Sequence, residues 1–394
     1  MIMESEITGI LEHDLHGRRF KVFAEIDLGA LKRNYIKIAQ TVRARKPDAG
    51  IIPVIKADAY GHGAVRVMLA LIECGARCFA VSSIPEALEL RGALADNRIS
   101  EKVDILILGF SQETDADLLA KYDLIQTVFS LDYAKKLNDS AAALGVDIRI
   151  HVKLDTGMNR LGFSAKHVDE SVGEIKEALA LGHLKAEGIF SHYACADEAE
   201  SGLTEIQNAR FSEMLSKLAA EGIAFKTRHI CNSAAAIRDM GDIYDAVRPG
   251  IILYGLMPSD EFSELKLESV MRLKSCIAHI HELEAGDTVS YGAEFTAPEK
   301  MRIATIPIGY ADGFIRAYKS ASLKVRGNRV PIIGRICMDQ CMIDITDTDA
   351  DYGDEVTIFD SPEEVEALAR CAGTIGYEVL CLVGKRVPRV CVES

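Results

Sequence analysis

Eight short apolar runs, each followed by a stretch of helical character, occupy residues 28 to 255. The runs are rich in β-branched residues and lie at 51–55, 78–82, 104–108, 125–129, 147–153, 185–190, 227–231 and 245–248. Between them, stretches such as 84–94 and 209–221 carry apolar residues at helical spacing. This alternation is typical of a parallel sheet wound by βα units. Eight strands within about 230 residues favour a closed (β/α)8 barrel, or TIM barrel, over an open doubly wound sheet.

The pattern changes after about residue 265 to short alternating runs punctuated by glycine and proline. These runs lie at 275–283, 301–308, 329–334, 342–346, 355–359 and 385–392. They predict an all-β second domain with one helix at 362–370. We therefore expect a barrel domain over 28–264, whose first helix Asp27 would cap, and a β domain over 265–394, joined by the strand at 21–27. Because no low-complexity linker separates them, the domains should pack together around a catalytic cleft.

Composition excludes several classes of protein. The 394 residues include 45 Lys and Arg against 59 Asp and Glu, a formal net charge of −14. Without a basic run, this charge disfavours nucleic acid and anionic membrane as partners. The opening M-I-M-E-S-E lacks the positive charge of a signal peptide, and no apolar stretch approaches the ~18 residues of a membrane helix. A cytoplasmic protein is therefore expected.

The cysteines and histidines form no recognisable disulfide or metal pattern. The ten cysteines include no C-x-x-C pair and are too dilute for a disulfide scaffold. The ten histidines form no H-E-x-x-H motif or Cys/His cluster. We expect reduced, buried cysteines and no metal site.

Residues with the chemistry of a site come after several of the predicted barrel strands. They are Lys56, Asp155, Arg160, His192, Asn232, Ser233, Arg248, Pro249 and Gly250. Barrel enzymes place their catalytic groups at the rim formed by the carboxyl ends of the strands. Any one of these residues could form an ordinary rim salt bridge, but the concentration of Lys, Arg and His on one rim indicates a site.

Two features of this rim suggest a cofactor. Ser233 before A-A-A-I and Gly250 after the eighth strand resemble a phosphate cradle, although an N-cap serine and a tight-turn glycine would look the same. Lys56 ends an apolar strand, where burial lowers the pKa of an amine. Together they suggest pyridoxal phosphate bound as a Schiff base. The G-H-G at 61–63 lacks the third glycine of a dinucleotide motif, and no P-loop motif occurs.

A series of motifs resembles one family. The stretch V-I-K-A-D-A-Y-G-H-G at 54–63 is similar to the cofactor-lysine segment of the alanine racemases. Further matches follow in the family's order: H-V-K-L-D-T-G-M-N-R-L-G-F (151–163), S-H-Y-A (191–194), C-N-S-A-A-A (231–236), V-R-P-G-I (247–251), V-S-Y-G-A (289–293), P-I-G-Y-A-D-G (307–313), G-R-I-C-M-D-Q (334–340) and R-V-P-R (386–389). They cover nearly the whole chain and are highly specific together.

The resemblance implies an isomerase that interconverts L-alanine and D-alanine, a peptidoglycan precursor, through a pyridoxal phosphate aldimine. It also implies a homodimer whose two sites each take residues from both subunits. Lys56 would hold the cofactor and act as one base, and Tyr291 of the partner subunit would be the other. The remaining cofactor contacts would be Tyr60, Ser233, Gly250 and Ile251 at the phosphate and Arg248 at the pyridine nitrogen.

The same resemblance places residues around the substrate. The carboxylate would be bound by Arg160 and the Met338 backbone, His192 would support Arg248 and Tyr291, and Tyr310, Arg335 and Asp339 would line the entry. Lys153 matches a position that some members carry as a carbamate, and the sequence leaves that modification open. Asp58 and His62 are expected to be structural.

Chemistry supports two bases. Racemisation removes the Cα proton from one face and returns one to the other, which lysine and tyrosine on opposite sides of the cofactor would achieve. Both have ordinary pKa values near 10, so both must be lowered for work near neutral pH. An arginine at the pyridine nitrogen cannot give up its proton, which limits charge delocalisation into the ring and curbs transamination.

Two other functions use the same cofactor. Decarboxylases of basic amino acids share the architecture but have an acidic partner at the pyridine nitrogen and a cysteine base, so Arg248 and Tyr291 argue against them. A non-catalytic pyridoxal phosphate carrier lacks the β domain expected after residue 265. Where the family often has tyrosine before R-V-P-R, this chain has Lys385. That difference leaves the strictness for alanine over serine or larger amino acids open.

Overall fold

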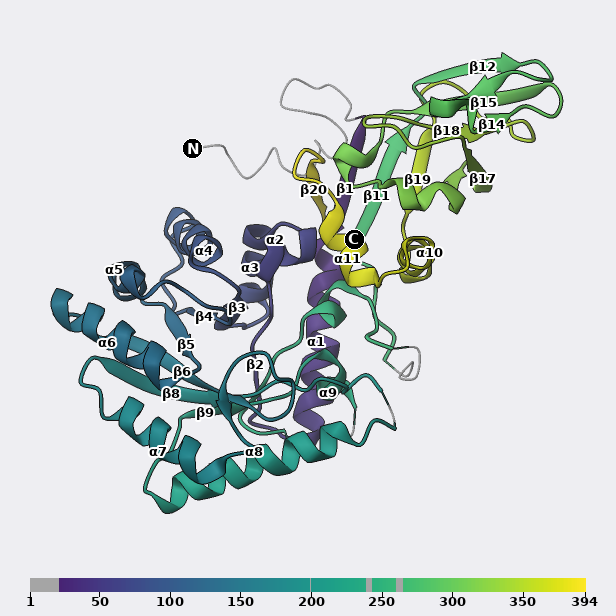
Figure 1. The fold of residues 1–394 in the computed structure, drawn as a ribbon. Helices are drawn as coiled ribbons and strands as arrows, with labels where there is room; N and C mark the ends of the chain where they lie inside the picture. The colour runs from purple at the N-terminus through teal and green to yellow at the C-terminus, as the bar shows by residue number, and fades with distance from the viewer. Residues whose placement is uncertain (1–20, 199, 239–242, 260–264) are drawn as a thin grey trace.

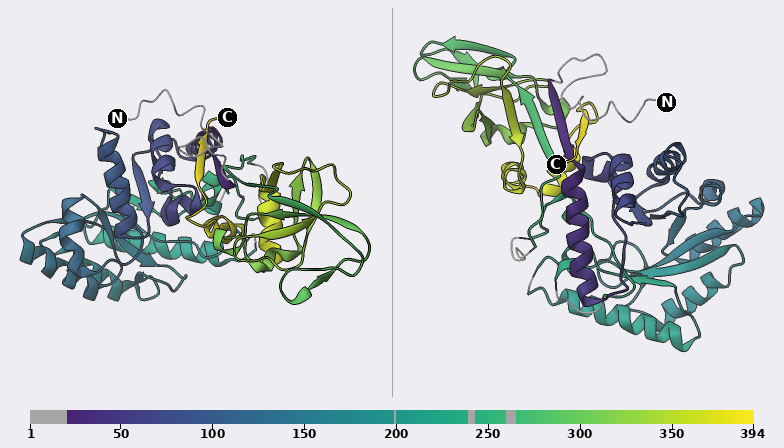
Figure 2. Two further views of the ribbon diagram at one scale, coloured as in Figure 1. Left: turned by 90° about the horizontal axis from the view of Figure 1, so that it is seen from above. Right: turned by 180° about the vertical axis from the view of Figure 1, so that it is seen from behind.

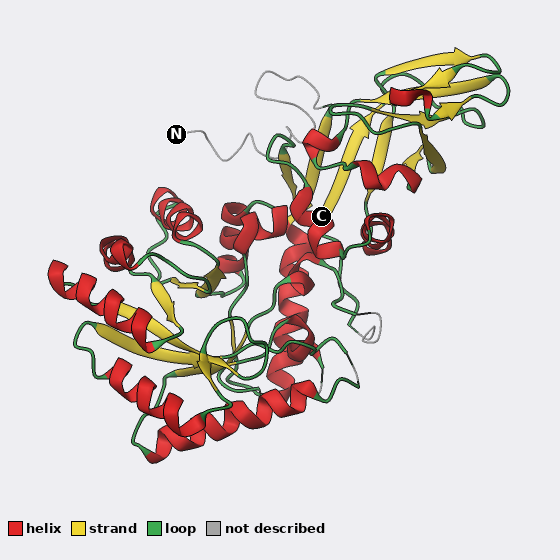
Figure 3. Cartoon of the chain, viewed as in Figure 1, coloured by secondary structure: helices red, strands yellow, loops and turns green. Residues whose placement is uncertain are grey.

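The computed structural model describes residues 21–198, 200–238, 243–259 and 265–394. Figure 1 shows two parts, a helix-wrapped barrel and an elongated β domain, that meet at one end of the long helix α1 (Leu28–Arg45). Figure 3 shows the same division by secondary structure, with most helices around the barrel strands. The acidic opening segment considered above lies outside the described residues.

The first part is a parallel barrel. Its strands are β2 (Gly50–Ile51), β3 (Cys78–Val81), β4 (Asp104–Ile107), β5 (Ile125–Val128), β6 (Ile148–Asp155), β8 (Leu184–Phe190), β9 (Thr227–His229) and β10 (Ala246–Val247). They pair in the order β2-β10-β9-β8-β6-β5-β4-β3, and a parallel bridge between Val54 and Ala80 joins the two ends. The predicted eight-stranded TIM barrel is confirmed. A two-residue strand, β7 (Phe163–Ser164), pairs with β6 and was not predicted.

The helices of the barrel part cover its outside or begin at the rim formed by the ends of its strands. Besides α1 they are α2 (Lys56–Gly61), α3 (Ala64–Glu73), α4 (Ile84–Asp96), α5 (Ala116–Lys121), α6 (Leu131–Leu144), α7 (Val168–Leu179), α8 (Leu203–Ala220) and α9 (Ser233–Ile237). Helix α1 begins where predicted, because the Asp27 carboxylate accepts a 2.9 Å hydrogen bond from the Ala30 N–H and so caps it. Its buried face, which includes Leu31, Ile38 and Val42, packs into the main hydrophobic core.

The second part is built on a nine-stranded sheet, in the order β12-β15-β18-β17-β16-β19-β11-β1-β20. The strands are β1 (Val22–Asp27), β11 (Met271–Cys276), β12 (His279–Leu283), β15 (Met301–Ile306), β16 (Ser322–Val325), β17 (Asn328–Ile333), β18 (Cys341–Asp344), β19 (Glu355–Phe359) and β20 (Arg389–Val392). A hairpin of β13 (Thr288–Val289) and β14 (Phe295–Thr296) stands apart. The predicted all-β domain is confirmed, but its run at 275–283 divides between β11 and β12.

The first and last described strands, β1 and β20, lie side by side in this sheet. Strand β1 pairs antiparallel with β11 and parallel with β20, and it runs directly into α1. The predicted helix at 362–370 is present as α10 (Pro362–Ala372). A second helix, α11 (Gly376–Leu382), was not predicted, and it packs against α2 of the barrel part.

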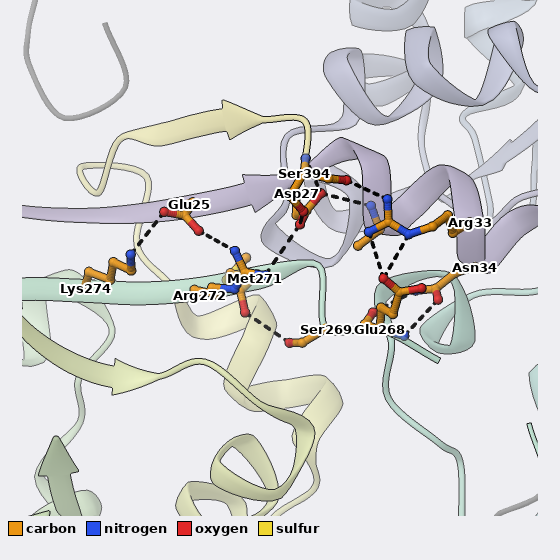
Figure 4. Close-up of polar contacts among 11 residues, drawn as sticks. Glu25, Asp27, Arg33, Asn34, Glu268, Ser269, Met271, Arg272, Lys274 and Ser394 are labelled. Carbon is orange, nitrogen blue, oxygen red and sulfur yellow. Dashed lines mark hydrogen bonds and ion pairs between the residues drawn. The ribbon is translucent and has the colours of Figure 1, made fainter. Parts of the chain in front are cut away.

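Polar contacts connect the two parts at the start of α1 (Figure 4). The Glu268 carboxylate accepts hydrogen bonds from Nε and Nη2 of Arg33, at 2.9 and 2.7 Å. The Asn34 side-chain amide bonds both backbone groups of Glu268, at 2.7 and 2.8 Å. Arg33 also donates to the backbone oxygen of Ser394 at 2.6 Å, and both views of Figure 2 place the C-terminal end at this junction. Arg33 therefore joins the start of α1, the interdomain connection and the C-terminus.

Across the described ranges, none of the helices combines the length and apolar character needed to span a bilayer.

Candidate active site

A cavity of about 520 Å³ opens at the carboxyl ends of the barrel strands. The predicted site residues that line it are Lys56, Tyr60, Lys153, Arg160, His192, Asn232, Ser233, Arg248 and Gly250. The structure thus brings together most of the predicted rim. Asp155 is an exception, because its carboxylate accepts the backbone N–H groups of Gly157 and Asn159 and serves a turn.

Lys56 is followed by a left-handed turn. Residues 57–60 all have φ of 53° or 54° and ψ between 40° and 49°, the left-handed helical region. Each such residue other than glycine costs roughly 1–2 kcal/mol, so the turn needs support from its surroundings. Lys56 and Tyr60 lie at the two ends of this turn, and both line the cavity. The turn therefore sets their spacing.

The Lys56 amine is poised to lose its proton. Burial lowers its pKa, and the positive charge of Arg160 lowers it further. Lys56 therefore has a larger neutral fraction near neutral pH than a lysine in water, as expected from its position at the end of an apolar strand. A neutral amine is the form that acts as nucleophile or base.

A cradle of donors faces the cavity beside Tyr60. The Gly250 N–H donates to the Ser233 hydroxyl at 2.8 Å, and helix α9 begins at Ser233 with Asn232 as its N-cap. A Cβ on Gly250 would lie 2.6 Å from the Tyr60 hydroxyl oxygen, so the glycine lets the tip of Tyr60 approach the Gly250 backbone closely. Ile251 follows and is fully buried. This cradle of hydroxyl and backbone groups suits an anion.

Arg248 is buried among neutral histidines. Its Nη2 donates to the carbonyl of Ser191 at 2.6 Å and to Nδ1 of His192 at 3.2 Å, and its Nη1 bonds Nδ1 of His229. Burial lowers the pKa values of both histidines well below the ordinary range, and the charge of Arg248 adds to that shift. Burial also lowers the pKa of Arg248, but only to about 10. The arginine therefore keeps its proton, and the histidines can accept its hydrogen bonds.

Lys153 lies in the cavity wall, on strand β6, and is buried. Its Nζ donates to the Leu154 carbonyl at 2.6 Å and lies 5.4 Å from the centroid of the Phe190 ring. Burial, followed by the charge of Arg248, lowers its pKa to about 7. At neutral pH a large share of Lys153 is therefore an uncharged amine. Arg160 lines the same cavity and is exposed.

Tyr291 and Met338 belong to a different cavity of the same chain. This second cavity, about 700 Å³, lies on the β domain, and Asp339 lines it too. The Tyr291 side chain is 71% exposed. The turn that carries Tyr291 is stabilised by a hydrogen bond of 2.8 Å from the Ser290 hydroxyl to the Arg335 carbonyl. One chain alone does not bring Tyr291 to Lys56.

The predicted entry residues also lie on the β domain. Arg335 bonds the Glu294 carboxylate, Asp339 accepts from Nη2 of Arg386 at 2.6 Å, and Tyr310 is half exposed. None of the three lines the Lys56 cavity within this chain.

Sequence reasoning missed Tyr377, which lines the Lys56 cavity from helix α11. It also missed Glu86, whose carboxylate accepts a hydrogen bond from the Ala57 N–H at 2.8 Å. The I-P-E at 84–86 is a helix-start pattern that could have drawn attention to Glu86. The glycine-flanked stretch before Tyr377 gave no comparable signal.

No group of three or more His, Cys, Asp or Glu side chains placed to hold a metal ion occurs within the described ranges.

Comparisons with known proteins agree across the whole chain. Residues 26–258 match the family model described as "Alanine racemase, N-terminal domain", and residues 270–391 match "Alanine racemase, C-terminal domain". The relative named "Alanine racemase 1" from Clostridium acetobutylicum is 43% identical over 381 residues, covering 95% of this chain and 96% of that protein. An alanine racemase from Methanococcus maripaludis is 40% identical, covering 94% and 98%.

Solved structures agree as well. The alanine racemase of Clostridium difficile 630 superposes with a TM-score of 0.88 at 41% identity, covering 95% of this chain and 96% of that one. The Bacillus anthracis alanine racemase with bound L-Ala-P has a TM-score of 0.85 at 33% identity, covering 95% of each chain. Two family models that together span most of the chain, with relatives of this identity and coverage, show that the chain belongs to the alanine racemase family of isomerases.

Proposed function

We propose that this isomerase interconverts L-alanine and D-alanine with pyridoxal phosphate as its cofactor, held by Lys56. The observation that carries the proposal is one cavity that combines a lysine of lowered pKa, a cradle of donors and a buried, protonated arginine. When bound, the cofactor supplies an aldehyde that joins to amines and a ring that withdraws electrons from the substrate Cα–H bond.

The residues present fit this cofactor. Tyr60, Ser233, Gly250 and Ile251 would hold the phosphate through hydroxyl and backbone N–H groups. Among the described residues that line the cavity, Lys56, Lys153, Arg160 and Arg248 are basic, and only Asp197 is acidic. A cavity of this charge favours a ligand that carries a phosphate and a carboxylate.

Lys56 and Arg248 would act on opposite ends of the cofactor. Lys56, with its lowered pKa, would take or return the Cα proton on one face of the substrate. Arg248 would face the ring nitrogen. Because its pKa of about 10 keeps it protonated, it would hold its own proton and leave the nitrogen without one.

The second base would be Tyr291 of the partner subunit in a homodimer. The separation of the Lys56 cavity from the Tyr291 cavity supports a shared site, since a two-base reaction needs both groups at one substrate. The high exposure of Tyr291 leaves its hydroxyl free of cover from its own chain. Met338 of the partner subunit would offer its backbone to the substrate carboxylate, and Tyr310, Arg335 and Asp339 would line the entry.

The remaining predicted residues would support these steps. Arg160 would bind the substrate carboxylate beside Lys56, and His192 would hold Arg248. Lys153 would assist from the cavity wall, and its partly uncharged amine is the form that carbamate formation requires. Lys385, where the family often has tyrosine, is exposed and lines neither of the two cavities described above.

The boundaries and location predicted from the sequence belong to the same proposal. We take the barrel domain as 28–264 and the β domain as 265–394 with the strand at 21–27, which the pairing of β1 with β11 and β20 supports. All ten cysteines are free, which fits a reducing compartment such as the cytoplasm.

Absorbance and isotope exchange together test the proposal. The purified protein should bind pyridoxal phosphate with a spectrum distinct from that of the free cofactor, and borohydride should fix the cofactor to Lys56. In D2O, both enantiomers of alanine should gain deuterium at Cα as they interconvert. A protein that binds no pyridoxal phosphate, or that leaves the Cα–H of both enantiomers unexchanged, would rule out the proposed reaction.

A further inference from the structure

The left-handed turn after Lys56 is held by contacts that the proposed reaction does not use. Four consecutive residues without glycine adopt it, namely Ala57, Asp58, Ala59 and Tyr60. A chain of L-residues does not stay in this region unless its surroundings stabilise it. The contacts around the turn come from three places in the sequence.

The first contacts are local. The Asp58 carboxylate accepts a hydrogen bond from the N–H of Ala64, the first residue of α3, at 2.7 Å. His62 is fully buried, and its Nδ1 lies 2.9 Å from the Ala59 carbonyl and 3.0 Å from the Tyr60 carbonyl. Carbonyls only accept, so Nδ1 carries the proton. The imidazole stacks on Tyr254 at 4.4 Å between ring centroids, which fixes the ring.

The second contact comes from the first turn of α4. The Glu86 carboxylate accepts the Ala57 N–H with one oxygen and the Ser82 N–H, at 2.7 Å, with the other. This carboxylate therefore ties the start of the turn to the end of strand β3.

The third contact comes from the end of the chain, in the β domain. Arg389 donates from Nε to the Gly61 carbonyl at 2.8 Å, and from its other nitrogens to the carbonyls of Val383, Gly384 and Val387 at 2.6 to 2.7 Å. At Gly61 a Cβ would lie 2.5 Å from the Leu380 carbonyl oxygen, so the turn packs directly on α11. One guanidinium thus fastens the turn to the segment that follows α11.

We infer that Asp58, His62 and Arg389 are positioning residues that hold the left-handed turn, and through it set the placement of Lys56 and Tyr60. The inference rests on the proposed function only in taking Lys56 as the cofactor lysine. It gives the final arginine of the R-V-P-R motif a role across the two domains. Arg389 lines neither cavity, so it acts through the backbone of the turn.

Arg389→Lys tests this role. The planar guanidinium donates to four carbonyls at once, whereas a lysine ammonium has only three donors on one atom and cannot reach all four. Arg91→Lys is a matched control. Arg91 likewise donates from Nε, Nη1 and Nη2 to three carbonyls, those of Tyr122, Val103 and Asp123, away from the cavity. Backbone hydrogen exchange of the full-length protein should rise about 10-fold or more over residues 57–64 in Arg389→Lys, and should stay unchanged there in Arg91→Lys.

A second pair of variants covers the case in which Arg389→Lys does not fold. Asp58→Ala removes one acceptor near the surface, and Ser130→Ala removes the matched N-cap acceptor of α6, which takes the Tyr133 N–H at 3.2 Å. Only Asp58→Ala should raise exchange over 57–64. Equal exchange over 57–64 in a variant and its control would overturn the inference.

Cofactor affinity and a rescue complete the test. Arg389→Lys should raise the dissociation constant for pyridoxal phosphate about 10-fold, and Arg91→Lys should leave that constant unchanged. Adding Ala57→Gly to Arg389→Lys should recover most of that affinity, because glycine adopts the left-handed region without support. Failure of the rescue would overturn the link from the turn to Lys56. Failure of the wild-type protein to bind pyridoxal phosphate would instead overturn the proposed function, since hydrogen exchange is read without the cofactor.

Discussion

Burial changes the pKa values of individual side chains at the cavity. Desolvation lowers the pKa of the Lys56 amine, while Arg248 keeps its proton at a pKa of about 10. The histidines that contact Arg248 stay neutral, so they accept its N–H groups rather than repel it. A base of lowered pKa and a fixed cation in one cavity favour proton transfer beside a bound anion.

Replacing Lys56 by alanine should remove covalent attachment of the cofactor and abolish racemisation in both directions. Lys153 cannot take over, because it is buried and its amine donates to the Leu154 carbonyl. Borohydride reduction followed by denaturation should leave pyridoxal absorbance on the wild-type chain and none on Lys56→Ala. A covalently labelled Lys56→Ala chain would disprove the assignment.

Tyr291→Phe should slow racemisation of both enantiomers by roughly 10²- to 10⁴-fold, because each direction needs both bases. Cofactor binding should persist, since Tyr291 lies outside the Lys56 cavity of its own chain. In D2O, Cα exchange should survive for the enantiomer whose proton faces Lys56, which the family resemblance identifies as D-alanine, and should collapse for L-alanine. Equal loss of exchange for both enantiomers would contradict a two-base mechanism.

Among the helices and strands, the sequence predicts those that follow from local apolar periodicity and misses those that depend on tertiary contacts. The barrel strands and the α1 cap follow from apolar runs and from Asp27 at a helix start. The turn after Lys56 could not be predicted, because alanine and tyrosine rarely adopt positive φ, and one aspartate, which does so more often, does not indicate four such residues in a row. Helix α11 was missed because its seven residues are too few for a clear period. Both are stabilised by tertiary packing on each other.

Ala57→Gly should stabilise the protein. Alanine in the left-handed region costs about 1–2 kcal/mol, and glycine at an unstrained position costs about 0.5–1 kcal/mol in unfolded-state entropy. The Ala57 side chain is exposed, so its loss opens no cavity. The balance predicts a gain of about 0.5–1 kcal/mol in the free energy of unfolding, measured by urea denaturation. Ala142→Gly, at an exposed position of the right-handed helix α6, should destabilise the protein instead.

For the whole molecule, the junction at α1 is one of the contacts that hold the two parts together, beside those of Arg389 and α11 with the turn after Lys56. Glu268 contacts Arg33 and Lys37 of α1, and the hydrogen bond from Arg33 lowers its pKa to about 2. Because the folded pKa lies below the ordinary value near 4.3, ionised Glu268 stabilises the folded state above that value. The stabilisation is lost as pH falls from about 4.5 toward 2. The side chain is 38% exposed, so the contribution is at most about 1 kcal/mol.

Glu268→Gln should therefore lower the urea midpoint at pH 7, and its difference from the wild type should shrink between pH 4.5 and pH 2 as the wild-type carboxylate becomes protonated. Glu213→Gln, at an exposed position in the middle of α8, is the control and should leave the urea midpoint at pH 7 unchanged. Protein concentration must be equal in all samples, because an oligomer gains stability with concentration. A difference that stays constant through this range would show that Glu268 acts by packing rather than by charge.

Mixed dimers test the shared site at the scale of the assembly. The Lys56 cavity and the exposed Tyr291 are separate in one chain, so a complete site would need two chains. A heterodimer of Lys56→Ala and Tyr291→Phe chains has one site with both wild-type groups, Lys56 from one chain and Tyr291 from the other, and one site with neither. Equal amounts of the two inactive proteins, unfolded and refolded together, should give half heterodimers and so recover about one quarter of wild-type activity. Each protein refolded alone should stay inactive. Heterodimers isolated with two different affinity tags and found inactive would show that the two bases do not come from different subunits.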